Sequence, residues 1–594
     1  MRSRLVLATG ALAIVAVTLL IYAPVYDAGL VWDDKIIFHD NAWLRYGDAW
    51  KDYIFRNFFD WVHYFRPLVV ALFVAEARGF DASPGPMHVV SLSLHITNVL
   101  LVGWLALLLR AAGAERHRFE MPALVAMLVY AVHPAAIEPV VWISSQAELL
   151  VTLFLLLALI CNTTLRSDTF RAVATSTCFF LAACAKESAI SLPLVIALFD
   201  WVQPSRSGAT NAHLRAVLRR QWRVYVGILI AGIAYLALRA WALGYLVHPL
   251  AMQVQPLSSW ARLQMVSYTY VTYWRILLWP MYGLGPFHVV DAARFSSMNV
   301  ASAGADALAL AIVAAGAWCM YRRSPWGTLV AAFSIALLPV LHIIPVAFDE
   351  SLYHERYMMT AAALACALIP QLASSVRIPA TRLRAAAAVA GGFFVAWIGL
   401  AIVNIRVTLP LWSDETKLWL WELGKNPDSV TALHHLLTTY MELGDRTRAD
   451  EMATRLIAKK APCAMCMVNI ANLAIWEGDA TRAALALDEA RGLVARQQNQ
   501  RTVEGFILAT GGLREINGDA AGAEEAYRDV AKMDPLDPDA RFALALLLAR
   551  QHRTTEARAA FAEALSLLAP DQRPQKRATF DATLQDAARR APPD

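Results

Sequence analysis

Charged residues are scarce in this sequence. Only 17% of its 594 residues are Asp, Glu, Lys or Arg, and 58% are hydrophobic. A soluble globular chain is closer to one quarter charged, so this composition excludes an ordinary soluble protein over most of the length. The net charge of +5 is small, and the arginines fall in short runs between apolar segments. That distribution is typical of membrane topology and argues against a nucleic-acid-binding protein.

Cysteine is also sparse, with seven residues in the chain. Five of them lie in apolar segments and are interpreted as packing residues. Cys463 and Cys466 are separated by two residues, but no second pair of Cys or His at ligand spacing accompanies them. A zinc site is therefore not predicted. Outside the cytoplasm, a local disulfide at the start of a helix is the favoured interpretation.

A cleavage motif is missing after the first apolar run, which extends from Leu5 to Ala23. The run is also longer than the core of a usual signal peptide. We therefore predict a first membrane helix with a cytoplasmic N-terminus. The segment 27–85 that follows is polar and aromatic, and we expect it to form an outer loop at the membrane interface.

Apolar runs continue to residue 406, and with the first helix they predict an all-α bundle of about eleven membrane spans over residues 1–406. The predicted spans are 5–23, 87–109, 119–134, 143–165, 171–185, 188–202, 222–243, 302–321, 326–345, 357–374 and 385–406. Arginines concentrate in the loops that this count places inside, as the positive-inside rule requires. The apolar segment 262–281 contains Arg262 and Arg275. It is interpreted as an interfacial or re-entrant helix within a long outer loop, 244–301.

Residues 407–594 are charged, helical in period and repetitive, and this count places them outside as well. Gly-Asp pairs begin at Gly444, Gly478 and Gly518, and so recur at a nearly regular interval. Alanine follows each glycine after five residues, at Ala449, Ala483 and Ala523, and Ala557 continues the pattern. A helix-turn-helix unit of about 34 residues with small residues at the crossing resembles the tetratricopeptide repeat. Such arrays bind peptides, so this region is interpreted as a binding domain for a protein or peptide.

Several polar residues fall on the predicted outer side of the membrane. Asp33 and Asp34 are adjacent carboxylates just beyond the first span, where charge is costly unless it is used. The others are Arg66, His88, His95, Asn98, His133, Glu138, Lys186, Glu187, His354, Glu355 and Arg356. His88, His95 and Asn98 share one helix face, so His95 and Asn98 either take part in ligand binding or only hold neighbouring helices together.

An ordered series of motifs runs through the chain. It comprises VWDDK at residues 31–35, FRPL at 65–68, PMH at 86–88, VHPAAIEPVVWIS at 132–144, AKES at 185–188, YWRILLWP at 273–280 and ERY at 355–357. Together with the terminal repeats, this order resembles the transmembrane-and-tetratricopeptide proteins of the O-mannosyltransferase type and their bacterial relatives, within the GT-C glycosyltransferases. The resemblance covers nearly the whole chain. It departs from the family pattern at Trp32 and Ser188 and in the small number of repeats.

The resemblance implies transfer of a sugar from a polyprenyl-phosphate donor to an acceptor, with a protein hydroxyl preferred, on the periplasmic side of a bacterial inner membrane. Asp33 or Asp34 then serves as the base or as an anchor for the acceptor. Glu138 is the candidate for a second catalytic carboxylate, which either holds a metal ion or orients the acceptor. The cations Arg356, Lys186 and Arg66 are candidates for the donor phosphate, and they are supported by Glu355, His88, His95 and Glu187. Glu355 is expected to orient the Arg356 guanidinium or a neighbouring cation.

Metal dependence stays open, because Asp34 and Glu138 can also hold Mg²⁺ or Mn²⁺ through their oxygens. The acceptor is open too. Transfer to lipid A or another glycan is an alternative within the enzyme class. A non-enzymatic membrane scaffold that binds partners through its repeats is the alternative outside it.

Overall fold

The computed structural model describes residues 2–56, 64–109, 117–202, 210–246, 257–290, 292–297, 299–344, 351–377, 379–460, 463–497 and 499–590. The chain divides into two compact units. The apolar unit comprises residues 1–28, 65–69 and 84–413, and the repeat unit comprises residues 29–64, 70–83 and 414–594. Most of the first predicted loop thus belongs to the repeat unit, and the predicted domain boundary at residue 406 falls inside a helix.

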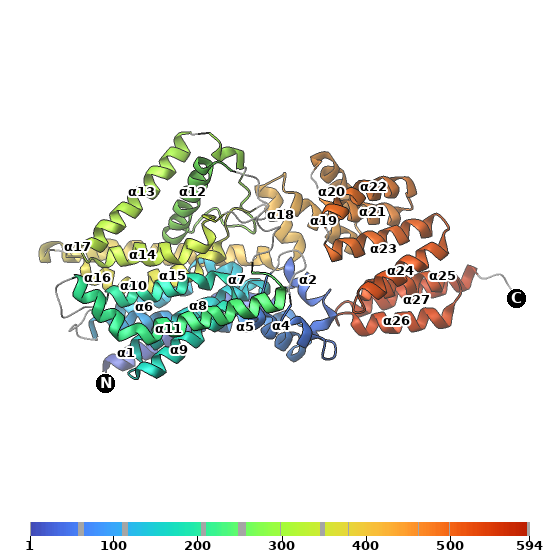
Figure 1. Ribbon diagram of the computed structural model, residues 1–594. Helices are drawn as coiled ribbons and strands as arrows, with labels where there is room; N and C mark the ends of the chain where they lie inside the picture. The colour runs from blue at the N-terminus through green and yellow to red at the C-terminus, as the bar shows by residue number, and fades with distance from the viewer. Residues whose placement is uncertain are drawn as a thin grey trace. The chain divides into compact units, whose positions relative to one another are not determined.

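Helices form the apolar unit, and no strand occurs within the ranges given above; the only pairing there is an isolated antiparallel bridge between Val289 and Ser351. The helices, drawn in Figure 1, are α1 (Arg2–Tyr22), α5 (Pro84–Leu108), α6 (His117–Ala131), α7 (Ile137–Val141), α8 (Gln146–Thr164), α9 (Asp168–Ala185), α10 (Leu192–Val202), α11 (Thr210–Leu243), α12 (Ser259–Leu278), α13 (Val300–Tyr321), α14 (Pro325–Leu337), α15 (Met359–Ala367), α16 (Ile369–Ser375) and α17 (Ala380–Thr408).

The predicted count of eleven spans needs correction. Among the described residues, six helices are long and apolar enough to cross a membrane: Leu5–Asp27, Pro84–Leu108, Ile143–Thr164, Arg215–Leu243, Val300–Tyr321 and Arg384–Trp412. Two bent helix pairs, Glu120–Ala131 with Pro134–Val141 and Glu355–Ala367 with Ile369–Ser375, raise the number to eight. The predicted spans 171–185, 188–202 and 326–345 are helical but too short or too polar for a core that needs about 20 apolar residues.

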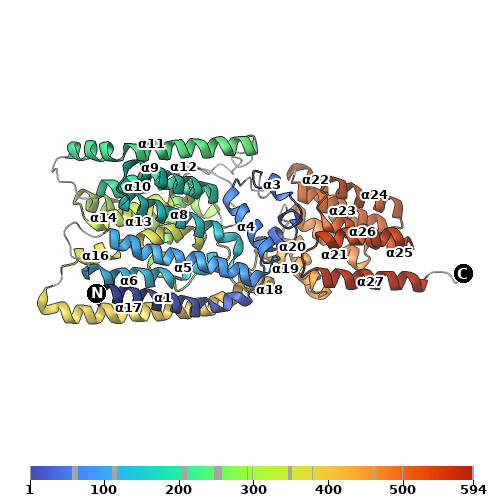
Figure 2. The ribbon, with the colours of Figure 1, turned by 90° about the horizontal axis from the view of Figure 1, so that it is seen from below.

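Burial differs sharply among the apolar helices. In the stretch that includes α8, 78% of the most apolar window is buried, whereas the value is 11% for both α11 and α17. Figure 2 shows α11 and α17 along opposite margins of the unit. Exposed apolar helix surface on this scale is unfavourable in water, and a lipid environment removes that cost.

Polar side chains meet at both ends of α8. Near its start, Glu148 pairs with Lys186, which follows the last residue of α9. Near its end, Asn162 and Gln221 donate hydrogen bonds to the Asp200 carboxylate at 2.9 and 2.7 Å. Glu148 and Asn162 are nearly four helical turns apart, which corresponds to about 21 Å along the helix axis. The two polar clusters therefore lie at opposite ends of α8.

Glycine permits one close helix contact in this unit. A Cβ atom added to Gly327, in the first turn of α14, would clash with the backbone nitrogen of Met320 in α13. No side chain tolerates that approach, so the α13–α14 hairpin requires glycine at this position.

The repeat unit contains short helices from the first loop and a longer array. The first group is α2 (Asp33–Phe38), α3 (Trp50–Tyr53) and α4 (Pro67–Gly79), of which residues 67–69 belong to the apolar unit. The array is α18 (Glu415–Lys425), α19 (Val430–Glu442), α20 (Arg446–Lys459), α21 (Ala464–Glu477), α22 (Ala480–Gln497), α23 (Gln500–Ile516), α24 (Ala520–Met533), α25 (Pro538–Arg550), α26 (Thr554–Leu567) and α27 (Arg573–Arg590).

The Gly-Asp pairs mark the turns between paired helices, as the sequence predicts. All three glycines have positive φ, a left-handed conformation that glycine adopts without strain. The following aspartates, Asp445, Asp479 and Asp519, cap the next helix by accepting from a backbone N–H at 2.9–3.1 Å. Ala449, Ala483, Ala523 and Ala557 are all fully buried at the helix crossings. The predicted helix-turn-helix unit is confirmed.

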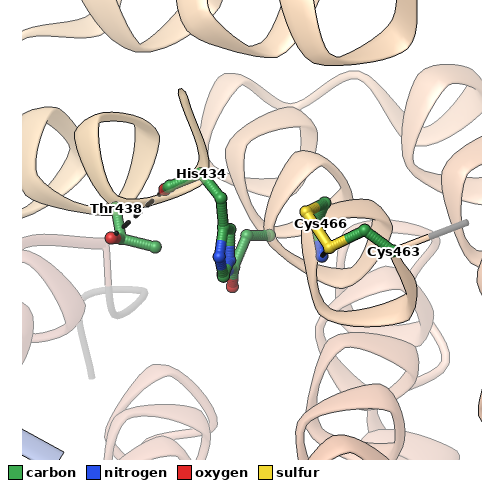
Figure 3. The surroundings of a disulfide bond; sticks show 5 residues. His434, Thr438, Cys463 and Cys466 are labelled. Atoms are coloured by element: carbon green, nitrogen blue, oxygen red, sulfur yellow. Dashed lines mark hydrogen bonds between the residues drawn. A yellow bond between two sulfur atoms is a disulfide. The ribbon is translucent and has the colours of Figure 1, made fainter. Parts of the chain in front are cut away.

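A disulfide joins Cys463 and Cys466 at the start of α21 (Figure 3), as the sequence favours. The Cys463 sulfur also caps this helix by accepting from the Cys466 N–H at 3.1 Å. The neighbouring helix α19 contributes His434, whose Nε2 lies 2.7 Å from the Asn469 amide nitrogen. These contacts tie α21 to α19 within the array.

Candidate functional site

A buried ion pair forms the centre of the candidate site in the apolar unit. The Arg356 guanidinium bonds to Glu138, and the Arg356 backbone N–H donates to the same carboxylate at 3.1 Å. Both side chains are buried, with 11% and 4% of their surfaces exposed. The guanidinium carbon lies 4.7 Å from the ring centres of both Trp142 and Tyr357. Glu138, not Glu355, therefore anchors the arginine, and two aromatic rings orient its planar fork.

A second cation lies on the same aromatic ring. The Lys186 ammonium bonds to Glu148 and is 4.4 Å from the Tyr357 ring centre. Burial lowers the pKa of Lys186 to about 8, although the negative charge of Glu148 opposes the shift. The positive charges of Arg66 and Arg356 contribute to the lowering of this pKa. Two cations predicted to bind the donor phosphate, Arg356 and Lys186, are thus brought together around Tyr357.

The third predicted cation pairs with a predicted supporting carboxylate. Arg66 donates from Nε and Nη2 to one oxygen of Glu187, at 3.0 and 2.9 Å. The Arg239 guanidinium lies 3.8 Å from the other oxygen of Glu187. Glu187 immediately follows Lys186, so this second ion pair adjoins the first cluster through the chain.

Glu355 has a different partner from the one that the sequence predicts. Its carboxylate lies 2.8 Å from Nε2 of His288, whose ring stacks on Tyr353 at 4.1 Å. Glu355 therefore orients a neighbouring imidazole from the long loop 244–301. His354 lies next to the central pair, with Nδ1 3.6 Å from a Glu138 oxygen. Burial and the charge of Arg356 lower the pKa of His354, so this imidazole is neutral near pH 7.

A small cavity adjoins Tyr357 and Glu148, which contact the two cations. Its other lining residues include Val151 and Leu155 from α8 and Leu192 from α10. Its volume of about 10 Å³ is enough for one water molecule. Apolar side chains of α8 and α10 therefore lie next to the residues that hold the cations.

Of the three polar residues on one face of α5, His95 and Asn98 hold neighbouring helices together. His95 Nε2 lies 3.1 Å from the Ala131 carbonyl oxygen in α6, and the Asn98 amide donates to the Leu149 carbonyl in α8 at 3.0 Å. These bonds satisfy buried polar groups and connect neighbouring helices. His88, seven residues before His95, is also completely buried.

The acidic pair belongs to the repeat unit. Asp33 and Asp34 occupy the first turn of α2, where the helix dipole favours negative charge. Asp34 is completely buried. The structure therefore divides the predicted catalytic carboxylates between the two units, with Glu138 in the apolar unit.

No group of three or more His, Cys, Asp or Glu side chains is placed to hold a metal ion in the part of the chain that the structure describes. Both oxygens of Glu138 accept hydrogen bonds from Arg356, one from the guanidinium and one from the backbone. That arrangement suits an anchor for arginine better than a metal ligand.

Several residues of the cluster were not among the predicted site residues: Trp142, Glu148, Arg239, His288, Tyr353 and Tyr357. Glu148 had a usable signal, because a carboxylate within an apolar span is expensive and normally serves a function. Tyr357 directly follows Arg356 and completes the ERY motif. His288 had no signal in the sequence, since only the folded loop places it beside Glu355.

Comparison with known protein families supports the repeats. Residues 517–575 match the family model described as tetratricopeptide repeat. Among solved structures, the crystal structure of MamA is 20% identical, covering 27% of this chain and 88% of that chain, with a TM-score of 0.20. The crystal structure of the yeast Tom70 is 11% identical, covering 79% and 90%, with a TM-score of 0.23. No curated protein matches this chain. Tetratricopeptide arrays present extended surfaces that bind other proteins.

Proposed function

We propose that this protein is a membrane glycosyltransferase of the GT-C type, which moves a sugar from a polyprenyl-phosphate donor to an acceptor hydroxyl on the periplasmic side of a bacterial inner membrane. The ordered motifs motivate the proposal. The arrangement of Arg356 and Lys186 around Tyr357 is the observation that carries it.

The cation cluster suits the phosphate of such a donor. A guanidinium presents a planar pair of donors that matches two phosphate oxygens, and an ammonium adds a compact charge. The leaving phosphate gains negative charge as its bond to the sugar breaks, and fixed cations stabilise that charge. The lipid surrounding the helices accommodates the isoprenoid chain, and Val151, Leu155 and Leu192 supply apolar side chains near the cluster.

The reaction has a simple balance. The acceptor oxygen forms a bond to the anomeric carbon of the sugar, and the bond from that carbon to the donor phosphate oxygen breaks. The acceptor proton passes to Asp33 or Asp34, and polyprenyl phosphate leaves with the electron pair. Glu138 serves as the anchor of Arg356. Both oxygens of Glu138 already accept hydrogen bonds from Arg356.

The proposed orientation has the N-terminus in the cytoplasm and the repeats in the periplasm, which requires an odd number of crossings. The six long helices supply an odd number when one of the two bent helix pairs also crosses. Arg171 lies at the end that the sequence assigns to the cytoplasm, where it donates to the Arg220 carbonyl at 3.3 Å. A disulfide at Cys463 and Cys466 suits the oxidising periplasm.

The proposed function is tested by comparing a deletion strain with its parent. Mass spectra of periplasmic proteins, including pilins, should lose a glycan in the deletion strain and regain it on complementation. Loss of a sugar from lipid A or another glycan, with protein glycans unchanged, would identify the alternative acceptor. Unchanged glycans of every class would overturn the proposal.

The repeats favour a second candidate function, a membrane scaffold that assembles envelope proteins. Complementation with Asp33→Asn and Asp34→Asn variants separates the two. A scaffold retains its phenotype when these variants are expressed at the normal level, whereas an enzyme that uses either carboxylate as its base does not.

A further inference from the structure

The acidic pair follows a backbone turn with an unusual residue. Trp32 has φ 53° and ψ −123°, the conformation of the first central position of a type II′ turn. The turn spans residues 31–34 and is closed by the Asp34 N–H, which donates to the Val31 carbonyl at 3.0 Å. Glycine is the usual residue at this position, because a side chain is strained there. The sequence instead places its largest side chain directly before Asp33.

Glu415, in the first turn of α18, contacts this turn. One of its carboxylate oxygens accepts the Trp32 N–H at 2.5 Å, and the other accepts the indole N–H of Trp419. Glu415 is only 6% exposed. The Trp32 ring packs edge to face on Trp419, with ring centres 5.6 Å apart. Trp419 in turn stacks on His435 of α19 at 4.2 Å.

A strained turn persists only where its surroundings hold it in place. Glu415 and Trp419, two residues of the array that contact Trp32, both belong to α18. Glu415 lies 383 residues after Trp32 in the sequence. We propose that Glu415 is a positioning residue, which holds the strained turn at Trp32 and thereby fixes the orientation of Asp33 and Asp34. The role in catalysis rests on the proposed function. The first helix of the array is then part of the active machinery in addition to binding partners.

If Glu415 only attached the first loop to the array, the strained turn at Trp32 would have no explanation. The loop already has other ties to the array, including the ion pair between Lys35 and Glu442 at 2.9 Å. That pair is 29% and 62% exposed, so it contributes little to stability. Attachment alone also requires no positive φ at tryptophan. The buried acceptor at Glu415 satisfies the backbone N–H of the strained residue itself.

The test uses the full-length protein in lipid nanodiscs. Hydrogen exchange is measured for peptides that cover residues 31–38 in the wild type and in Glu415→Ala, Glu415→Gln and Glu442→Gln variants. Glu415→Ala should speed exchange at these amides by about tenfold, since the strained turn opens when its acceptor is removed. Glu415→Gln keeps one acceptor for the Trp32 N–H, but its NH2 group then faces the Trp419 indole N–H, so exchange should fall between the wild type and Glu415→Ala. Glu442→Gln disrupts only the exposed ion pair and should have no effect.

Turnover separates positioning from general stability. With the polyprenyl-phosphate donor, Glu415→Ala should reduce kcat about tenfold while the donor KM changes less than twofold. Glycine accepts the turn geometry without strain, so Trp32→Gly added to Glu415→Ala should restore most of kcat. This rescue is the result that a merely misfolded Glu415→Ala protein does not give.

Three outcomes overturn the inference. Unchanged exchange in Glu415→Ala shows that this residue does not hold the turn. Faster exchange with unchanged kcat, or no rescue by Trp32→Gly, shows that the turn does not position the catalytic groups. A wild type that transfers no sugar removes the proposed function and the catalytic part of the inference with it, while the exchange data still decide whether Glu415 holds the turn.

Discussion

Arg356 and Glu138 form a buried ion pair although they are 218 residues apart in the sequence. The pair joins the segment before α15 to α7, and both segments were predicted to lie on the outer side of the membrane. Removing one member of a buried pair leaves the other charge without compensation, which typically costs about 3–5 kcal/mol. Tests of function at this position therefore need a substitution that keeps the positive charge.

Arg356→Lys is that substitution. A lysine keeps the charge beside Glu138 but loses the planar fork, so donor kcat/KM should fall roughly 10- to 100-fold, nearly as far as in Arg356→Ala. Purified variants are compared by initial rates at varied donor concentration. Arg275→Lys is the matched control, because Arg275 also lies over a tyrosine ring, at 4.9 Å from Tyr282, outside the cation cluster. Full activity in Arg356→Lys would show that donor binding does not need the planar fork of the arginine.

The lowered pKa of Lys186 predicts that activity decreases at alkaline pH. Its pKa is lowered to about 8, so the ammonium loses its proton as the pH rises through this value. Donor kcat/KM, which reports the free enzyme, should fall above pH 8. Lys186→Arg stays charged and should retain its remaining activity to about pH 9.5. An identical alkaline limb in the Lys186→Arg variant would assign that titration to another group.

The lowered pKa of His434 predicts that the folded repeat array becomes less stable at acidic pH. Burial lowers its pKa to about 4, so the folded array binds fewer protons than the unfolded chain between pH 4 and the ordinary histidine pKa of 6.5. Stability from the neutral imidazole is complete above about pH 6.5 and is lost as the pH falls toward 4. Protonation also opposes the hydrogen bond from the Asn469 amide. His434→Gln should reduce the loss of stability on acidification by about 1 kcal/mol.

Thermal unfolding of the full-length protein at pH 7.5 and pH 5 measures this difference. The wild type should lose more melting temperature between the two conditions than His434→Gln. Equal losses would show that His434 does not control the acid response.

The sequence predicts much of this molecule where local rules apply. Gly444 and Asp445 indicate a turn and a cap, and Ala449 indicates a crossing, because each residue type meets a local backbone or packing requirement. The sequence analysis also grouped Lys186 with Arg356, and the structure places both on the Tyr357 ring, although the eleven-span count used for that grouping is wrong.

Other features depend on contacts between distant segments. Hydropathy counts apolar residues but does not locate helix breaks, so the 11-residue helix α10 was counted as a span. Glu355 was predicted to orient Arg356 or a neighbouring cation; in the structure Glu355 contacts His288, and Glu138 is the carboxylate that holds Arg356. No local rule relates Trp32 to Glu415, since only the folded array brings the two together.

The central claim is sugar transfer from a lipid donor, and release of polyprenyl phosphate tests it most directly. Purified full-length protein in nanodiscs is supplied with a panel of polyprenyl-phosphate sugars and an envelope extract as acceptor, and mass spectrometry quantifies the freed lipid phosphate and the glycosylated product. We predict both products with at least one donor in the wild type, and a loss of both in the Asp33→Asn/Asp34→Asn double variant of normal fold. Absence of both products with every donor, or full activity in the double variant, would contradict the account.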